Sequence, residues 1–147
     1  MANPLEQFQI KTIVPIPIGE IDASFTNASA FMLIAVAAAT LFLTLSMRGR
    51  STIPNRWQSM AELAYEFIGA MVRDNVGPEG RRYFPFIFSL FMFILFANLI
   101  GLIPYSFTVT SHIIVTFAMA ITVFLGVTLV GIVRHGFRFF TFFLPVG

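Results

Sequence analysis

Three long stretches without Asp, Glu, Lys, Arg or His constrain the fold of this chain more than any other feature. They run from about Ala28 to Met47, from about Tyr83 to Ile103 and from about Ile113 to Val133. An α-helix rises about 1.5 Å per residue, so about 20 residues suffice to cross the hydrocarbon core of a bilayer. Because lipid offers no hydrogen-bond partners, a spanning segment must satisfy its own backbone groups, as a helix does. We therefore expect three transmembrane helices.

The composition agrees with a membrane protein. Of the 147 residues, 57% are hydrophobic and 11% are charged, whereas soluble domains carry about 25% charged residues. A transmembrane β-barrel would show apolar and polar residues in alternation, and the segment Phe86–Phe93 does not alternate. The expected fold is an all-α membrane protein, with residues 1–147 forming a single membrane domain without repeats.

Several classes of function are disfavoured by what the sequence lacks. The net charge is only +2, and the basic residues are scattered at the ends of apolar runs, so we expect no nucleic-acid partner. The chain has no cysteine, which excludes disulfides and thiolate chemistry. It also shows no phosphate-binding loop, nucleophile elbow or zinc pattern. We expect no catalytic residue, no metal and no cofactor, and hence no enzyme.

A fourth segment, from Pro54 to about Val76, has a helical pattern of a different kind. Its apolar residues are spaced three and four apart and form one stripe along a helix: Trp57, Met60, Ala61, Ala64, Phe67, Ile68, Met71 and Val72. The polar residues of the segment are expected to lie off this stripe: Gln58, Glu62, Glu66 and Arg73. Charges within the segment disfavour a span. We interpret it as an amphipathic helix in the membrane interface with Trp57 at headgroup level. The alternative is a soluble helix docked on other protein.

The distribution of basic residues predicts the orientation. The loop from Pro104 to His112 has no Lys or Arg, and Lys11 alone precedes the first span. All other basic residues fall between spans one and two or after span three: Arg48, Arg50, Arg56, Arg73, Arg81, Arg82, Arg134 and Arg138. The positive-inside rule places these two groups on the inner side. The N-terminus is then outside, and spans two and three form a hairpin with a short outer loop.

Asn98 is the most informative polar residue because it lies within the second span. An amide in hydrocarbon needs a partner, so it faces either the bundle interior or a wet cavity. Gly101 shares its face and allows another backbone to approach. Two readings stay open for Asn98: a structural hydrogen bond between helices, or the lining of an aqueous pathway that opens to the outside.

Two histidines and a stripe of small residues complete the candidate set. His112, where the outer loop meets span three, either relays protons or acts as an ordinary cap. His135 lies on the inner side beside Arg134 and is expected to anchor the helix end. Ala118, Thr122 and Gly126 repeat every four residues along span three and predict a helix–helix contact.

No ionisable residue lies inside any predicted span, although such residues are the usual mark of proton relays in membranes. As given, the chain has no residue that could pass a proton across the bilayer on its own. An unrelated transporter or respiratory-complex anchor would need midplane charges or paired histidines, and the two histidines are predicted on opposite sides.

Several segments, taken in order, resemble one family. Pro4–Phe8 and Ser24–Asn27 look like the opening of subunit a of F-type ATP synthases, and Pro54–Ser59 resembles its interfacial helix. The most specific match is Asn98–Thr108 followed by Thr110–His112, which is similar to the hairpin of the alphaproteobacterial and mitochondrial branch. Phe143–Gly147 matches the exit from that hairpin.

The resemblance implies a stator in the membrane sector, beside the c-ring and the b subunits, with protons as the transported ion. It implies a multi-pass protein of a bacterial plasma membrane or a mitochondrial inner membrane. The family's essential arginine and most channel groups come after the point where this sequence ends, and no arginine here matches that position. We expect either a piece of a longer gene product or a split subunit. Asn98 and His112 are candidates near the outside-facing half-channel. The alternative function is a purely structural or assembly role.

Overall fold

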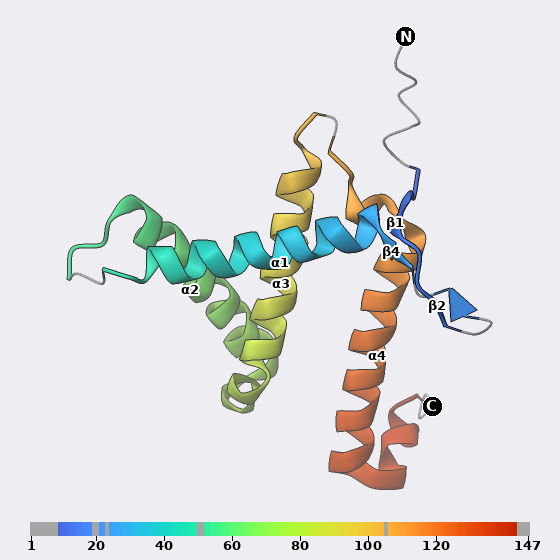
Figure 1. Ribbon diagram of the computed structural model, residues 1–147. Helices are drawn as coiled ribbons and strands as arrows, with labels where there is room; N and C mark the ends of the chain where they lie inside the picture. The colour runs from blue at the N-terminus through green and yellow to red at the C-terminus, as the bar shows by residue number, and fades with distance from the viewer. Residues whose placement is uncertain (1–8, 19–20, 23, 50–51, 105, 144–147) are drawn as a thin grey trace. The chain divides into compact units, whose positions relative to one another are not determined.

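The computed structural model describes residues 9–18, 21–22, 24–49, 52–104 and 106–143 (Figure 1). Its α-helices in these ranges are α1 (Asn27–Ser46), α2 (Arg56–Val76), α3 (Phe84–Gly101) and α4 (Ile113–His135). By length and composition, α1, α3 and α4 are able to cross a membrane. Their ends fall within two residues of the expected ends, so the three predicted spans and the all-α membrane class are confirmed.

The chain divides into two compact units, Met1–Val109 and Thr110–Gly147. Helices α1, α2 and α3 belong to the first unit, and α4 belongs to the second. Each unit is described by itself. The packing of the second and third spans as a hairpin, and the grouping of all residues into a single domain, therefore stay predictions.

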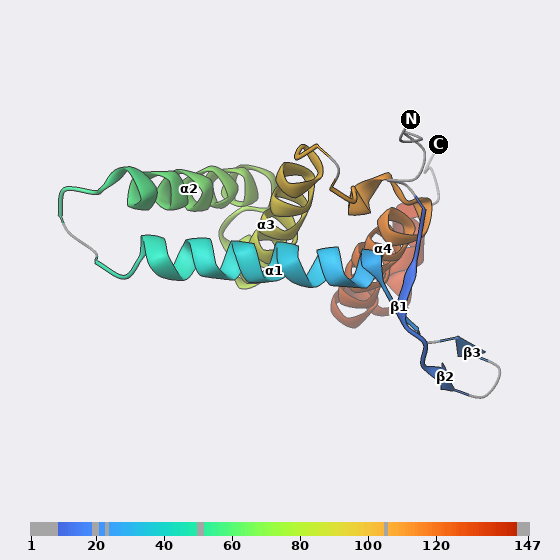
Figure 2. The same cartoon turned by 45° about the horizontal axis from the view of Figure 1, so that its top comes forward.

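The N-terminal segment contains strands that the sequence did not lead us to expect. Strand β1 (Thr12–Val14) pairs antiparallel with β4 (Phe25–Thr26), and β2 (Pro17–Ile18) pairs antiparallel with β3 (Ile21–Asp22) (Figure 2). Consecutive β-branched residues in β1 favour extended backbone. The pairings are too short to make the protein a sheet structure, and they place an ordered arm directly before the first span.

Asn27 fastens this arm to the start of α1. Its side-chain oxygen accepts a hydrogen bond from the backbone N–H of Lys11 at 3.1 Å, and its side-chain nitrogen donates to the carbonyl of Gln9 at 2.9 Å. Thr26 is the N-cap residue of α1, and its hydroxyl accepts from the backbone N–H of Ser29 at 3.4 Å. The Thr26 bond satisfies a backbone N–H of the first helical turn, which has no partner within the helix, and the two Asn27 bonds tie the arm to α1.

The core of the first unit lies where α1 crosses α3 (Figure 1). On α1 the buried positions carry small side chains, including Ala35 and Ala39, whereas α3 buries Met92 and Ala97. Small residues allow two helices to approach closely without a water-driven hydrophobic effect. Aromatic side chains fill the remaining space, as in the contact between the rings of Phe42 and Phe96, whose centroids are 5.6 Å apart.

Helix α2 is the predicted amphipathic helix, and it packs against both α1 and α3. It buries Ala61, Ile68 and Val72 against its own unit. Other apolar members of the predicted stripe are exposed: Trp57, Met60, Phe67 and Met71. The helix therefore docks on protein along one edge and leaves apolar side chains outward along the other, as an interfacial position requires.

Gln58 corrects one detail of the predicted stripe. We expected it off the apolar face, but it is buried, and its side-chain nitrogen donates to a carboxylate oxygen of Glu62 at 2.7 Å. A hydrogen bond to a charged acceptor offsets the cost of removing an amide from solvent. The periodic pattern predicts that polar residues lie outside. It does not predict the burial of an amide whose hydrogen-bond partner lies one turn away on the same helix.

In the second unit, η4 (Gly136–Phe143) folds back onto α4. Gly136 ends α4 with φ +56°, a left-handed conformation that glycine adopts without steric cost. The ring of Phe139 then lies directly over Gly131, where a Cβ atom would overlap it. The turn at Gly136 and the missing side chain at Gly131 together permit this close return.

Candidate functional site

Asn98 lies in the last two turns of α3 and is exposed on the surface of its unit. Its side-chain nitrogen donates to the carbonyl of Ile94 at 2.9 Å, one turn back along the same helix. This bond lowers the cost of holding an amide in an apolar helix. The side chain is an exposed amide on a predominantly apolar helix.

The loop after α3 closes the end of that helix. The Ser106 hydroxyl donates to the carbonyl of Ile100 at 2.6 Å, and the Thr108 hydroxyl donates to the carbonyl of Gly101 at 3.3 Å. The last carbonyls of a helix have no partner within the helix, and burying them unpaired in a membrane is costly. The sequence signal for this capping is the position of the two hydroxyl residues shortly after Pro104, just beyond the end of α3.

Gly101 allows this loop to pass close to the helix. A Cβ atom at Gly101 would lie 2.9 Å from Cγ2 and 3.0 Å from Oγ1 of Thr108. The glycine therefore permits a close approach, and the neighbour within its unit is the following loop. The expected role of Gly101 in packing against another helix stays a prediction.

Apolar side chains hold the same loop in place. Phe107 and Val109 are buried, and the ring of Phe107 lies 5.9 Å from the ring of Phe31 on α1, measured between centroids. The connection after α3 is thus anchored to two helices, by hydrogen bonds from its own hydroxyl groups to carbonyls of α3 and by a ring contact with α1. Asn98 lies beside an ordered end of the helix.

His112 occupies the N-cap position of α4. Its carbonyl accepts hydrogen bonds from the backbone N–H groups of Val115 at 3.1 Å and Thr116 at 3.2 Å, and its imidazole makes no capping bond. The side chain is half-buried. The cap reading therefore holds for the backbone, and a proton-relay role for the imidazole stays a prediction. His112 belongs to the second unit and Asn98 to the first.

The small-residue stripe of α4 lies on the surface of its unit. Ala118, Thr122 and Gly126 are exposed, and a Cβ atom at Gly126 would meet nothing within 4 Å. The Thr122 hydroxyl donates to the carbonyl of Ala118 at 2.8 Å, so its polar group is satisfied within the helix. A helix–helix contact along this stripe stays a prediction.

The C-terminal end of α4 is basic. Arg134 and His135 occupy its last turn and are exposed, where a positive charge interacts favourably with the partial negative charge of the helix end. Within the described ranges, no group of three or more His, Cys, Asp or Glu side chains is arranged to hold a metal ion.

Comparison with known proteins decides the family. The model of a family described as ATP synthase A chain matches residues 29–146, most of the chain. The chain belongs to the ATP synthase A chain family. It is 60% identical over its whole length to ATP synthase subunit a of Paramagnetospirillum magneticum, of which it covers 61%. It is 59% identical over 99% of its length to ATP synthase subunit a of Parvibaculum lavamentivorans, of which it covers 56%.

A relative outside the bacteria is also similar. ATP synthase subunit a of Chondrus crispus is 50% identical over the whole chain, which covers 58% of that protein. The resemblance to subunit a is thereby confirmed. The chain spans about 60% of the length of these curated relatives.

Proposed function

We propose that the chain serves in the stator and proton-channel subunit of the membrane sector of ATP synthase, where proton flow is coupled to rotation of the c-ring and to ATP synthesis. The observation that carries this proposal is the family match over residues 29–146, together with three helices able to span a membrane. The role is not catalytic, since the chemistry of ATP formation belongs to other subunits of such a complex.

The residues of the described spans support a role in shaping the proton path and not in carrying the proton. Helices α1 and α3 contain no ionisable residue, and those of α4 lie in its last turn. Proton transfer through a membrane needs groups that bind and release protons. In the proposed mechanism the carboxylates of the c-ring carry the proton across, and the spans of this chain shape the water-accessible path that leads to them.

Asn98 and His112 are the proposed polar groups on this path. Asn98 presents an amide on an apolar helix next to a capped helix end, and His112 begins the next span. An amide both donates and accepts, so it stabilises a chain of water molecules without itself changing charge. We propose that the two residues lie near the half-channel that opens to the outside.

The proposed partners are the c-ring, the b subunits and membrane lipid. Exposed apolar side chains along α4, including Phe117, Phe124 and Leu125, give it a surface suited to lipid or to another helix. The proposed location is a bacterial plasma membrane or a mitochondrial inner membrane, with the N-terminus outside as the basic residues predict.

The test is to purify ATP synthase from native membranes through a tag on the b subunit and to measure ATP-driven proton pumping in inverted vesicles. We expect this polypeptide to co-purify with the b and c subunits, and its deletion to abolish pumping. Co-purification with unchanged pumping after deletion would favour the alternative, a structural or assembly role. Absence from the purified complex would refute both.

A further inference from the structure

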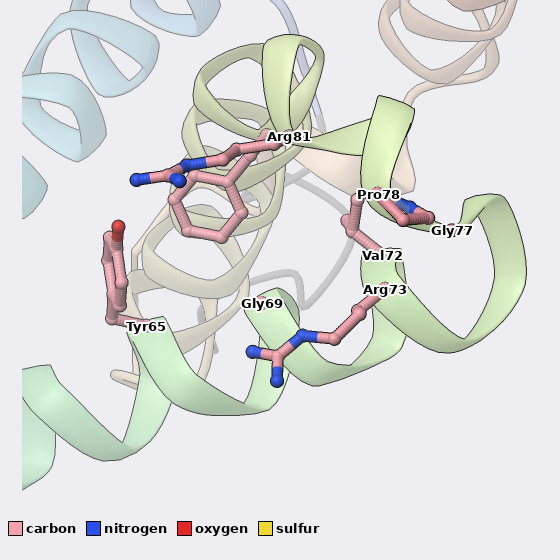
Figure 3. A pocket seen from close by; sticks show the side chains of 8 residues that line it. Tyr65, Gly69, Val72, Arg73, Gly77, Pro78 and Arg81 are labelled. Carbon is pink, nitrogen blue, oxygen red and sulfur yellow. The ribbon is translucent and has the colours of Figure 1, made fainter.

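A groove opens where α2 ends and α3 begins. Its cavity volume is about 460 Å³, and the described residues that line it come from α2, the following turn and α3: Tyr65, Gly69, Val72, Arg73, Gly77, Pro78, Arg81 and Phe84 (Figure 3). The groove is not part of the proposed proton path. Its position at the first residue of a membrane-spanning helix raises the question of what fills it.

The frame of the groove is set by close packing. Gly77 has φ +78° and turns the chain from α2 into η2 (Pro78–Arg82). A Cβ atom at Gly80 would lie 2.8 Å from Cγ1 of Val72, so η2 is pressed against α2. The ring of Tyr65 packs edge-on against the ring of Phe84, with 4.7 Å between centroids. The two walls are therefore held together by contacts within one unit.

The groove combines an apolar floor with a cationic rim. Gly69, Val72 and Phe84 supply the floor, whereas Arg73 and Arg81 reach over it. Figure 3 shows Arg81 at the top of this view and Arg73 below it, with Tyr65 to the left of both. Of the described lining residues, none is acidic. Such a rim favours an anion with several oxygens, because guanidinium groups bind phosphate with two parallel hydrogen bonds.

The location selects among anions. Arg73 and Arg81 belong to the basic segment that is predicted on the inner side, and α3 enters the membrane from Phe84 onward. Basic pockets at the ends of membrane helices on this side suit anionic lipid headgroups. A soluble phosphate would leave the apolar floor uncovered, whereas an acyl chain would cover it.

We propose that this groove binds an anionic phospholipid, with its phosphate between Arg73 and Arg81 and the start of an acyl chain over Phe84. The Tyr65 hydroxyl is placed to donate a further hydrogen bond to the headgroup. The bound lipid would bridge α2 to the start of α3. This inference depends on the membrane location and not on proton conduction.

The test uses native mass spectrometry of the full chain, purified in detergent and supplied with phosphatidylglycerol or phosphatidylcholine. We expect retention of phosphatidylglycerol over phosphatidylcholine. Replacing both arginines, Arg73→Gln with Arg81→Gln, should lower that retention at least about tenfold, since each lost charge-assisted hydrogen bond is worth about that factor. The control, Arg134→Gln with Arg138→Gln, removes equal charge from the second unit and should leave retention unchanged.

A second variant tests the floor without touching the charges. A Cβ atom at Gly69 would lie 3.7 Å from Cε2 of Phe84, an ordinary contact, so this position accepts a side chain. Gly69→Leu uses the larger leucine to occupy the groove. We expect it to reduce phosphatidylglycerol retention while the helix content measured by circular dichroism stays unchanged. Equal retention in the wild-type, double-arginine and Gly69→Leu chains would overturn the proposal.

Competition separates lipid from other anions. Glycerol phosphate, which has the headgroup charge without acyl chains, should displace phosphatidylglycerol only weakly. Displacement by equimolar glycerol phosphate would overturn the lipid assignment in favour of a soluble phosphate. Displacement by an equimolar poly-glutamate peptide would overturn it in favour of an acidic protein segment.

Discussion

At the scale of single residues, the end of α3 shows how the last backbone carbonyls of an apolar span find hydrogen-bond donors. The Ser106 hydroxyl donates to the Ile100 carbonyl, which also accepts from the backbone N–H of Ile103. The Thr108 hydroxyl donates to the Gly101 carbonyl, and the missing side chain of Gly101 makes room for Thr108. None of these residues is charged, so the helix end remains compatible with a membrane boundary. The capping residues and the pathway candidate Asn98 lie within a few residues of one another along the chain.

Gly101→Ala should loosen this end. The new methyl group would overlap the Thr108 side chain, and rotating that side chain away would break its hydrogen bond to the Gly101 carbonyl. We expect a loss of about 1–3 kcal/mol in the free energy of unfolding, as for other overpacked sites. Reversible unfolding of the full chain in mixed micelles, followed by circular dichroism, measures this.

Two control variants test whether the overlap with Thr108 causes the effect of Gly101→Ala. Gly126→Ala adds the same methyl group where nothing lies within 4 Å, so it should leave stability unchanged or slightly raised. Combining Gly101→Ala with Thr108→Ala removes the overlap, so the double variant should be destabilised by less than the sum of the two single variants. If the losses in the free energy of unfolding add up in the double variant, the overlap with Thr108 is not the cause of the Gly101→Ala destabilisation.

Asn98→Leu tests the proposed path at a residue of similar size. If the amide lines water, its replacement in the full-length subunit should lower ATP-driven proton pumping severalfold while the complex still assembles. Ser89→Ala is the matched control: Ser89 lies on the same helix, bonds to the carbonyl of Pro85 at 2.7 Å in the same manner, and faces the opposite side because a helix turns by about 100° per residue. Unchanged pumping in Asn98→Leu would make Asn98 a structural residue.

At the scale of elements, α2 is the helix whose two edges meet different surroundings. Ile68 is only 2% exposed, whereas Leu63 on the other edge is 71% exposed. The first edge packs within the unit, and the second is free to meet lipid or a partner. Docking and interfacial placement, posed as alternatives from the sequence, are therefore compatible in a single helix.

Ile68→Glu should detach α2 from its unit. A buried carboxylate without a partner, together with the lost apolar contact, costs at least about 3 kcal/mol. We expect little assembled complex on a native gel of solubilised membranes. Leu63→Glu places the same charge on the exposed edge and should leave docking within the unit intact. Normal assembly of Ile68→Glu would refute the observed buried edge.

The elements were predictable to different degrees, for physical reasons. The spans follow from uninterrupted apolar length, a signal that the bilayer imposes on sequence directly. The strands β1 to β4 were missed because each has at most three residues and is held by side chains such as Asn27, which no periodic pattern reveals. The burial of Gln58 was missed because periodicity sorts residues by type, and it does not foresee a satisfying neighbour such as Glu62.

The candidate site was predictable only in part. Asn98 stood out because an amide inside an apolar run is costly. The capping by Ser106 and Thr108 depends on how the chain turns after Pro104, which sequence pattern does not specify. The groove between Arg73 and Arg81 was also missed, since it arises from the turn at Gly77, which brings two arginines from different elements to one rim.

At the scale of the whole molecule, the order of spans fixes which loops share a side of the membrane. If α1, α3 and α4 all cross, the segment between α1 and α3 and the segment after α4 lie on one side, and the loop before α4 lies on the other. The basic residues follow this division, with none between Pro104 and His112. The crossings therefore group the loops into two sides, and the basic residues predict which of the two sides is inside.

Single cysteines test that orientation directly, because the chain contains no cysteine of its own. Gly49→Cys, Ser111→Cys and Thr141→Cys each place one thiol at an exposed position. With a membrane-impermeant maleimide, Ser111→Cys should react in right-side-out vesicles, and the other two should react only in inverted vesicles. Labelling of Ser111→Cys and Gly49→Cys from the same side would mean that α3 does not cross. Reversal of all three would retain the spans and refute the assignment of inside from basic residues, and with it the inner-leaflet position of the arginine-rimmed groove.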